Sequence, residues 1–176
     1  MEIDKSEIDG TIPLNQVIKE HTGFDCLPAT HEEIDELAEL GGLFLNNFNK
    51  EINNFDNPSK FGCHVEKLFI DQYLTRIEGY TGYPDAIYKS KTGRECYCEI
   101  KCFNELDNRS RGDTFSVSSC KRISQSAPHL LIGFEYKNTP TKQRIINSCI
   151  VKDVGNLSLK IKIEYATTNL KLYDEK

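Results

Sequence analysis

The spacing of apolar residues changes abruptly near Gly79, and this change constrains the fold more than any other feature. Before it, apolar residues between Lys60 and Ile77 recur at steps of three and four, as on one face of a helix. After it, residues 94–103 alternate between two kinds of side chain, as in a β-strand. We therefore expect a helix over 60–77, ended by Gly79, and then a hairpin with strands over 85–89 and 94–103.

A second helix is predicted before this one. Thr30 and Glu33 have the spacing of a capping box, and seven apolar residues follow at helical steps. They are Ile34, Leu37, Leu40, Phe44, Phe48, Ile52 and Phe55. A kink is expected at Gly41 and Gly42. Residues 1–29 have poor periodicity and are expected to form a loose arm with a short helix near Leu14 to Glu20.

The remaining segments complete an α/β (α+β) fold. Residues 115–126 favour a short helix, and strands are expected over 129–136, 144–151 and 157–165. The chain of 176 residues is expected to form one domain with a mixed central sheet flanked by helices. We divide it into an acidic arm and helix (1–56), a core (60–136) and C-terminal strands (137–176).

Composition bears on the compartment and the partner. No apolar run is long enough to cross a membrane, no export signal is visible, and the cysteine count of seven is odd. We expect reduced thiols in the cytoplasm. Residues 1–56 carry 13 acidic and 3 basic side chains, whereas residues 57–176 carry 14 acidic and 19 basic ones, so most of the chain is compatible with nucleic acid despite the net charge of -5.

The strand over 94–103 separates two kinds of chemistry. One face carries Cys96, Cys98, Ile100 and Cys102, and the other carries Tyr97, Glu99 and Lys101. The cysteines are interpreted as core packing, with a zinc or iron–sulfur site as the alternative. Hairpin pairing would bring Asp85 close to Glu99. Two converging carboxylates beside a lysine suit Mg²⁺ and phosphodiester hydrolysis, whereas an exposed Glu–Lys pair is the alternative.

Pro84-Asp85, thirteen intervening residues and Glu99-Ile100-Lys101 resemble the PD-(D/E)xK signature of restriction-endonuclease-like nucleases. The resemblance covers the central fifty to seventy residues. It implies a restriction-endonuclease-like core in which Asp85 and Glu99 hold Mg²⁺, the Ile100 carbonyl is a further ligand, and Lys101 assists the attacking water. Glu66, on the preceding helix, would be a second-shell or second-metal carboxylate. By this resemblance the core over 60–136 is catalytic.

A polar, basic stretch after the strand supplies the candidate DNA contacts. They are Asn104, Asn108, Arg109, Ser110, Arg111, Thr114, Ser116, Ser118, Ser119, Lys121 and Arg122. The alternative for each is an ordinary solvated loop residue.

We predict a type II restriction endonuclease that cuts double-stranded DNA with Mg²⁺ and acts as a homodimer, because two-fold DNA sites suit two-fold proteins. Two alternatives stay open. One is another nuclease of the superfamily, such as a junction resolvase, a repair enzyme or a phage or transposon endonuclease. The other is a non-catalytic DNA-binding module.

Overall fold

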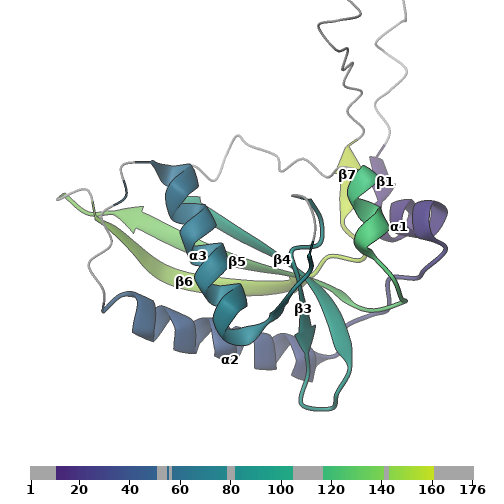
Figure 1. Cartoon of the computed structure of the whole chain (residues 1–176), viewed down its shortest axis with the longest axis horizontal. Helices are drawn as coiled ribbons and strands as arrows, with labels where there is room; N and C mark the ends of the chain where they lie inside the picture. The colour runs from purple at the N-terminus through teal and green to yellow at the C-terminus, as the bar shows by residue number, and fades with distance from the viewer. Residues whose placement is uncertain are drawn as a thin grey trace, which may run out of the picture.

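A computed structural model of the protein has a mixed sheet of five strands at its centre, and Figure 1 shows how the helices lie around it. The structure describes residues 11–50, 55, 57–78, 82–104, 117–140 and 143–160. The strands follow the order β2 (Thr75–Arg76), β3 (Ala86–Lys89), β4 (Glu95–Asn104), β5 (His129–Asn138) and β6 (Arg144–Asp153). Only β4 and β5 run parallel; the other neighbours are antiparallel. The predicted α/β (α+β) class with a mixed sheet is confirmed.

Two long helices, α2 (His31–Phe48) and α3 (Pro58–Tyr73), pack on one face of this sheet (Figure 1). The predicted capping box is present: the Thr30 side chain accepts from the Glu33 N–H, and the Glu33 carboxylate accepts from the Thr30 N–H. Phe44 of α2 and Phe69 of α3 meet edge to face, 5.4 Å apart, above Phe134 of β5. These aromatic contacts join both helices to the sheet in one main core.

The opposite face is covered at one end by a second, smaller core. Here α1 (Leu14–Thr22) and the 3₁₀ helix η2 (Val117–Arg122) lie beside a two-stranded sheet of β1 (Thr11–Pro13) and β7 (Ser158–Lys160) (Figure 1). Ile18, Ile123 and Tyr97 are buried together in this core. The described residues therefore sandwich the sheet at this end.

Several predicted boundaries are wrong, and nonlocal hydrogen bonds explain them. The helix expected to reach Ile77 ends at Tyr73, because Thr75 and Arg76 pair with β3 as the strand β2. The helix expected to reach Phe55 ends at Phe48. There the Asn49 side chain exchanges two hydrogen bonds with the Ile146 backbone of β6, which holds the chain against the sheet edge.

Other expectations are corrected or confirmed near the ends. The short helix near Leu14 is confirmed, but the arm before it is ordered from Thr11 as the strand β1. The strand expected over 157–165 is described only as β7, which pairs with β1 and not with the central sheet. Residues 1–10, Gly79 and residues 161–176 lie outside the described part. At Gly41 and Gly42, where a kink was expected, α2 continues as one helix.

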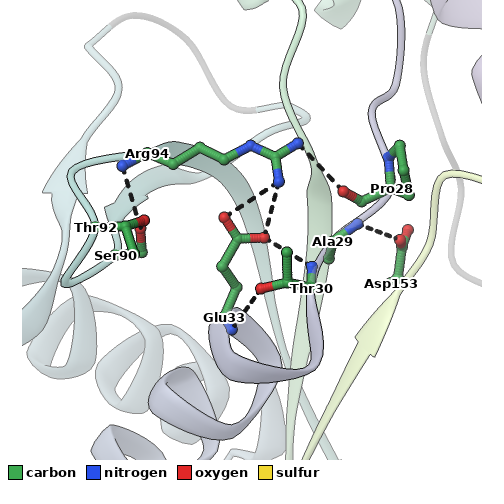
Figure 2. A network of polar contacts seen from close by, with 8 residues as sticks. All are labelled: Pro28, Ala29, Thr30, Glu33, Ser90, Thr92, Arg94 and Asp153. Carbon is green, nitrogen blue, oxygen red and sulfur yellow. Dashed lines mark hydrogen bonds and ion pairs between the residues drawn. The ribbon is translucent and has the colours of Figure 1, made fainter.

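A polar network around the buried Glu33 fixes the β3–β4 hairpin against the start of α2 (Figure 2). The Arg94 guanidinium lies 3.2 Å from the Glu33 carboxylate and also donates to the Pro28 carbonyl. Glu33 is 3% exposed, so its charge is compensated inside the protein. One turn along α2, Glu36 accepts from the Tyr88 hydroxyl and the Lys91 N–H. The hairpin is thus anchored to a helix at its tip.

Within the described residues, no helix combines the length and apolar character that crossing a membrane requires.

Candidate active site

Asp85 is held next to Glu99 by the pairing of β3 with β4. Ala86 lies opposite Cys98, so the next residue outward on each strand, Asp85 and Glu99, face each other. The Asp85 N–H donates to the Cys98 carbonyl at 2.9 Å, and the Asp85 carbonyl accepts from the Ile77 N–H at 3.2 Å. One carboxylate oxygen, Oδ2, accepts from the Ile100 N–H at 2.8 Å. Backbone and side chain of Asp85 are both fixed.

Glu99 and Lys101 form a close ion pair on the same face of β4. Lys101 Nζ lies 2.7 Å from Glu99 Oε1, and the Glu99 side chain is 15% exposed. Burial and the nearby charge of Asp85 raise the pKa of Glu99 to about 7, although Lys101 acts in the opposite direction. The second carboxylate oxygen, Oε2, is buried without a hydrogen-bond partner in the described structure. Such an oxygen can bind a cation or accept a hydrogen bond from a ligand.

Glu66 reaches the same site from α3. Burial raises the pKa of its carboxyl group, the charge of Asp85 raises it further, and Lys101 and Arg76 lower it. These influences place the Glu66 carboxylate within electrostatic reach of Asp85 and Lys101. The structure therefore brings Asp85, Glu99 and Lys101 together on β4 and the start of β3, and Glu66 on α3 is near enough for their charges to act on it.

The cysteines lie on the other side of β4, as the strand period predicts. Cys96 and Cys98 are fully buried in the main core with Ile100, and burial raises the pKa of Cys96 to about 12. All seven cysteines are free thiols. No group of three or more Cys, His, Asp or Glu side chains in the described ranges could hold a metal ion. The packing interpretation agrees with this arrangement.

A metal at Asp85 and Glu99 would consequently have two carboxylate ligands, with Glu66 farther away. Two carboxylates, one backbone carbonyl such as that of Ile100, and water or phosphate oxygens are a donor set that Mg²⁺ accepts, because it keeps several waters. The unpartnered Glu99 Oε2 fits this role. These residues supply hard oxygen ligands and no soft sulfur ligand.

The site lies where the second core ends and solvent access begins. Along one face of β4, Tyr97 is 1% exposed, the Glu99 side chain is 15% exposed and the Lys101 side chain is 35% exposed. Tyr97 is thus packed inside the second core, whereas part of the Lys101 side chain reaches the surface of the described residues. A charged group here acts in a medium less screened than bulk water.

The candidate DNA contacts are only partly within the described residues. Asn104 ends β4, Lys121 is exposed on η2, and the backbone of Ser118 and Ser119 belongs to η2. Six candidates lie outside the described part: Asn108, Arg109, Ser110, Arg111, Thr114 and Ser116. Arg122 is half-buried, and its guanidinium donates to three backbone carbonyls. Contact with DNA therefore stays a prediction for this set.

Two features of the site were not anticipated. The Tyr83 hydroxyl, next to the Pro84-Asp85 pair, lies 2.5 Å from His129 Nδ1, and both residues are buried. The other is that the guanidinium of Arg122, on η2, donates to the carbonyl of Pro84, directly before Asp85. Neither residue has a local sequence signal, because each partner lies tens of residues away in the chain.

Comparison with known proteins identifies the family. A family model described as the type II restriction enzyme MjaV family matches residues 8–176. The chain belongs to this family. A curated relative, the type II restriction enzyme MjaV of Methanocaldococcus jannaschii, is 29% identical over 170 residues, an alignment that covers 85% of this chain and 72% of the relative. The family match extends well beyond the central residues that carry the PD-(D/E)xK pattern.

Membership of the MjaV family confirms the predicted type II restriction endonuclease function. The protein is a DNA endonuclease, and the alternative of a non-catalytic DNA-binding module is set aside. The mixed sheet with flanking helices agrees with a restriction-endonuclease-like core.

Proposed function

We propose that this endonuclease hydrolyses phosphodiester bonds of double-stranded DNA with Mg²⁺ held by Asp85 and Glu99. The observation that carries the proposal is the buried oxygen Oε2 of Glu99, which has no partner among the described residues. A cation bound between the two carboxylates would satisfy this oxygen and offset the burial and the repulsion from Asp85 that together raise the pKa of Glu99. The Ile100 carbonyl is the further ligand in this proposal.

Each residue has a distinct part in the proposed reaction. Bound Mg²⁺ would polarise the scissile phosphate and increase the acidity of a coordinated water. Asp85 keeps a defined orientation because its Oδ2 already accepts from the Ile100 N–H. Lys101 favours the ionised form of Glu99 and offers its ammonium group to the attacking water and to the charge that develops on the phosphate.

Glu66 has a supporting role in this proposal. Its pKa is raised partly by the charge of Asp85, which means that its carboxylate responds to the same local potential. A carboxylate at that position can hydrogen-bond a metal-bound water or join a second metal. Loss of Glu66 should therefore weaken metal binding less than loss of Asp85 or Glu99.

The remaining expectations extend the proposal to the whole chain. We propose that residues 1–176 form a single nuclease domain that acts in the cytoplasm as a homodimer, with one active site for each DNA strand. The polar residues from Asn104 to Lys121 would face the DNA. Sedimentation of the free and DNA-bound protein measures the assembly state independently of cleavage.

Plasmid digestion with substituted proteins tests the proposal. Asp85→Asn and Glu99→Gln should abolish cleavage, because each removes one of two charged ligands, while DNA binding in EDTA remains. Isothermal titration with Mg²⁺ should lose its binding signal in both variants, which gives a readout independent of activity. Lys101→Met should slow cleavage and retain Mg²⁺ binding.

Lys89→Ala is the matched control, since it removes one positive charge from the far end of β3. It should cleave like the unsubstituted protein. Discrete plasmid fragments are the expected product pattern, whereas smeared or branch-specific products would indicate another kind of nuclease. Full cleavage by Asp85→Asn would refute the metal assignment.

A further inference from the structure

We infer that Arg122 is a positioning residue that holds the segment presenting Asp85 to the active site. The inference rests on the proposed metal role of Asp85. Arg122 ends η2, and its side chain reaches the chain that leads into β3. This assignment replaces a direct DNA contact for Arg122.

The contacts of the guanidinium define the role. Nη1 donates to the carbonyls of Gly82, at 2.5 Å, and Pro84, at 3.1 Å, and Nη2 donates to the Ile77 carbonyl at 3.2 Å. All three acceptors are main-chain oxygens on either side of the approach to Asp85. One side chain thereby joins two stretches of backbone, one at Ile77 and the other from Gly82 to Pro84.

Both stretches act directly on Asp85. The Pro84 carbonyl belongs to the same peptide unit as the Asp85 N–H, which donates to Cys98 on the opposite side. Ile77 accepts from Arg122 and, through its own N–H, donates to the Asp85 carbonyl. Arg122 therefore holds the peptide that carries the Asp85 N–H and also holds Ile77, the residue that donates to the Asp85 carbonyl.

Arginine suits this position better than lysine does. Its planar guanidinium has five N–H donors in fixed directions, so it can serve several carbonyls at once, whereas an ammonium group acts as a single point charge. The base of the side chain is also fixed. Cys120 and Ile123, on either side of Arg122 in the chain, are 1% and 4% exposed, and the Ile123 N–H donates to the Cys120 carbonyl.

Loss of the guanidinium should act on catalysis through the position of the Asp85 carboxylate. Displacement of a reacting group by about 1 Å costs on the order of 100-fold in rate. We therefore expect Arg122→Ala and Arg122→Lys to reduce the single-turnover cleavage rate by roughly 10- to 100-fold, and to raise the Mg²⁺ concentration at half-maximal rate. The lysine variant is decisive because it keeps the charge.

The experiment compares Arg122→Lys, Arg122→Ala, Asp85→Asn and the control Lys89→Ala in the full chain. Cleavage rates are measured against Mg²⁺ concentration, and DNA affinity is measured in EDTA over a series of salt concentrations. Positioning predicts that both Arg122 variants bind DNA with unchanged affinity and salt dependence in EDTA. Both should show the slower rate and the shifted Mg²⁺ requirement.

Three results would overturn the inference. A phosphate contact by Arg122 would leave Arg122→Lys near normal, while Arg122→Ala would bind DNA more weakly and the slope of log K against log salt would fall in magnitude by about 0.9. A purely structural role would lower the melting temperature without changing the Mg²⁺ requirement, and Arg122→Lys reports this even if Arg122→Ala does not fold. Normal rates in both variants, with Asp85→Asn inactive, would refute only the positioning role. Full activity of Asp85→Asn would instead refute the proposed function.

Discussion

The buried Glu99 carboxylate should make the metal-free protein less stable as pH rises. Its pKa is about 7 in the folded protein, against an ordinary value of 4.5, because burial and Asp85 disfavour its charge. Between these two values the folded protein holds a proton that the unfolded chain has released. Stability contributed by this group is therefore present at low pH and lost as pH rises toward and through 7.

The size of this effect follows from the difference between the two pKa values. A shift of one pKa unit corresponds to about 1.4 kcal/mol, so Glu99 should cost the folded state roughly 2 to 3 kcal/mol more at pH 8 than at pH 5. Glu99→Gln removes this titration. It also removes the ion pair with Lys101, a half-exposed group, and that loss is worth at most about 1 kcal/mol.

Urea unfolding followed by circular dichroism, in EDTA at pH 5, 6, 7 and 8, measures the effect. The free energy of unfolding of Glu99→Gln minus that of the unsubstituted protein should grow by roughly 2 to 3 kcal/mol from pH 5 to pH 8. Saturating Mg²⁺ at pH 8 should stabilise the unsubstituted protein and not the variant. The same comparison in an Asp85→Asn background is the control, and there the change should shrink because one cause of the raised pKa is gone.

A difference that stays constant between pH 5 and pH 8 would refute this reasoning. It would mean that the Glu99 carboxyl group is solvated well enough to ionise with its ordinary pKa of 4.5. A folded-state pKa at or below 4.5, with Lys101 outweighing burial and Asp85, would also leave the difference nearly constant, because its effect on stability would lie below pH 5. Either cause would remove the electrostatic argument for a cation between the two carboxylates.

Two further predictions concern the elements that support the site. Gly41→Ala should destabilise the protein by about 1 to 3 kcal/mol in urea unfolding, because an added Cβ would lie 2.7 Å from Cys149 Sγ and 3.1 Å from Ile132 Cδ1. Gly42→Ala is its matched control: its Cβ would meet nothing within 4 Å, so helix propensity should make it neutral or stabilising by up to about 1 kcal/mol. Arg94→Ala should cost roughly 3 kcal/mol because it leaves the buried Glu33 carboxylate without its partner, whereas Lys91→Ala, at a side chain 74% exposed, should change stability by less than about 1 kcal/mol. Equal effects within either pair would contradict the packing and charge arguments.

Local pattern was sufficient for the elements whose signals lie within a few residues. The capping box of Thr30 and Glu33 depends on a spacing of three residues, and both of its hydrogen bonds are present. The separation of Cys98 from Glu99 depends only on the alternation of side chains along a strand. The boundary at Tyr73 could not be predicted this way, because it depends on the pairing of Thr75 and Arg76 with a strand that follows ten residues later.

The sequence by itself determined that Glu99 and Lys101 share one face of β4 and that a carboxylate, Asp85, lies opposite Glu99. It also determined which chemistry these groups suit. Strand period and a short hairpin are local constraints, so the pattern of residues is enough to express them. Only the tertiary structure decided how far Glu99 is buried, and hence its pKa of about 7. It also decided that Arg122, 38 residues after Pro84, reaches back to the approach to Asp85. Burial and long-range hydrogen bonds depend on how the second core packs on the sheet, and no local spacing encodes that packing.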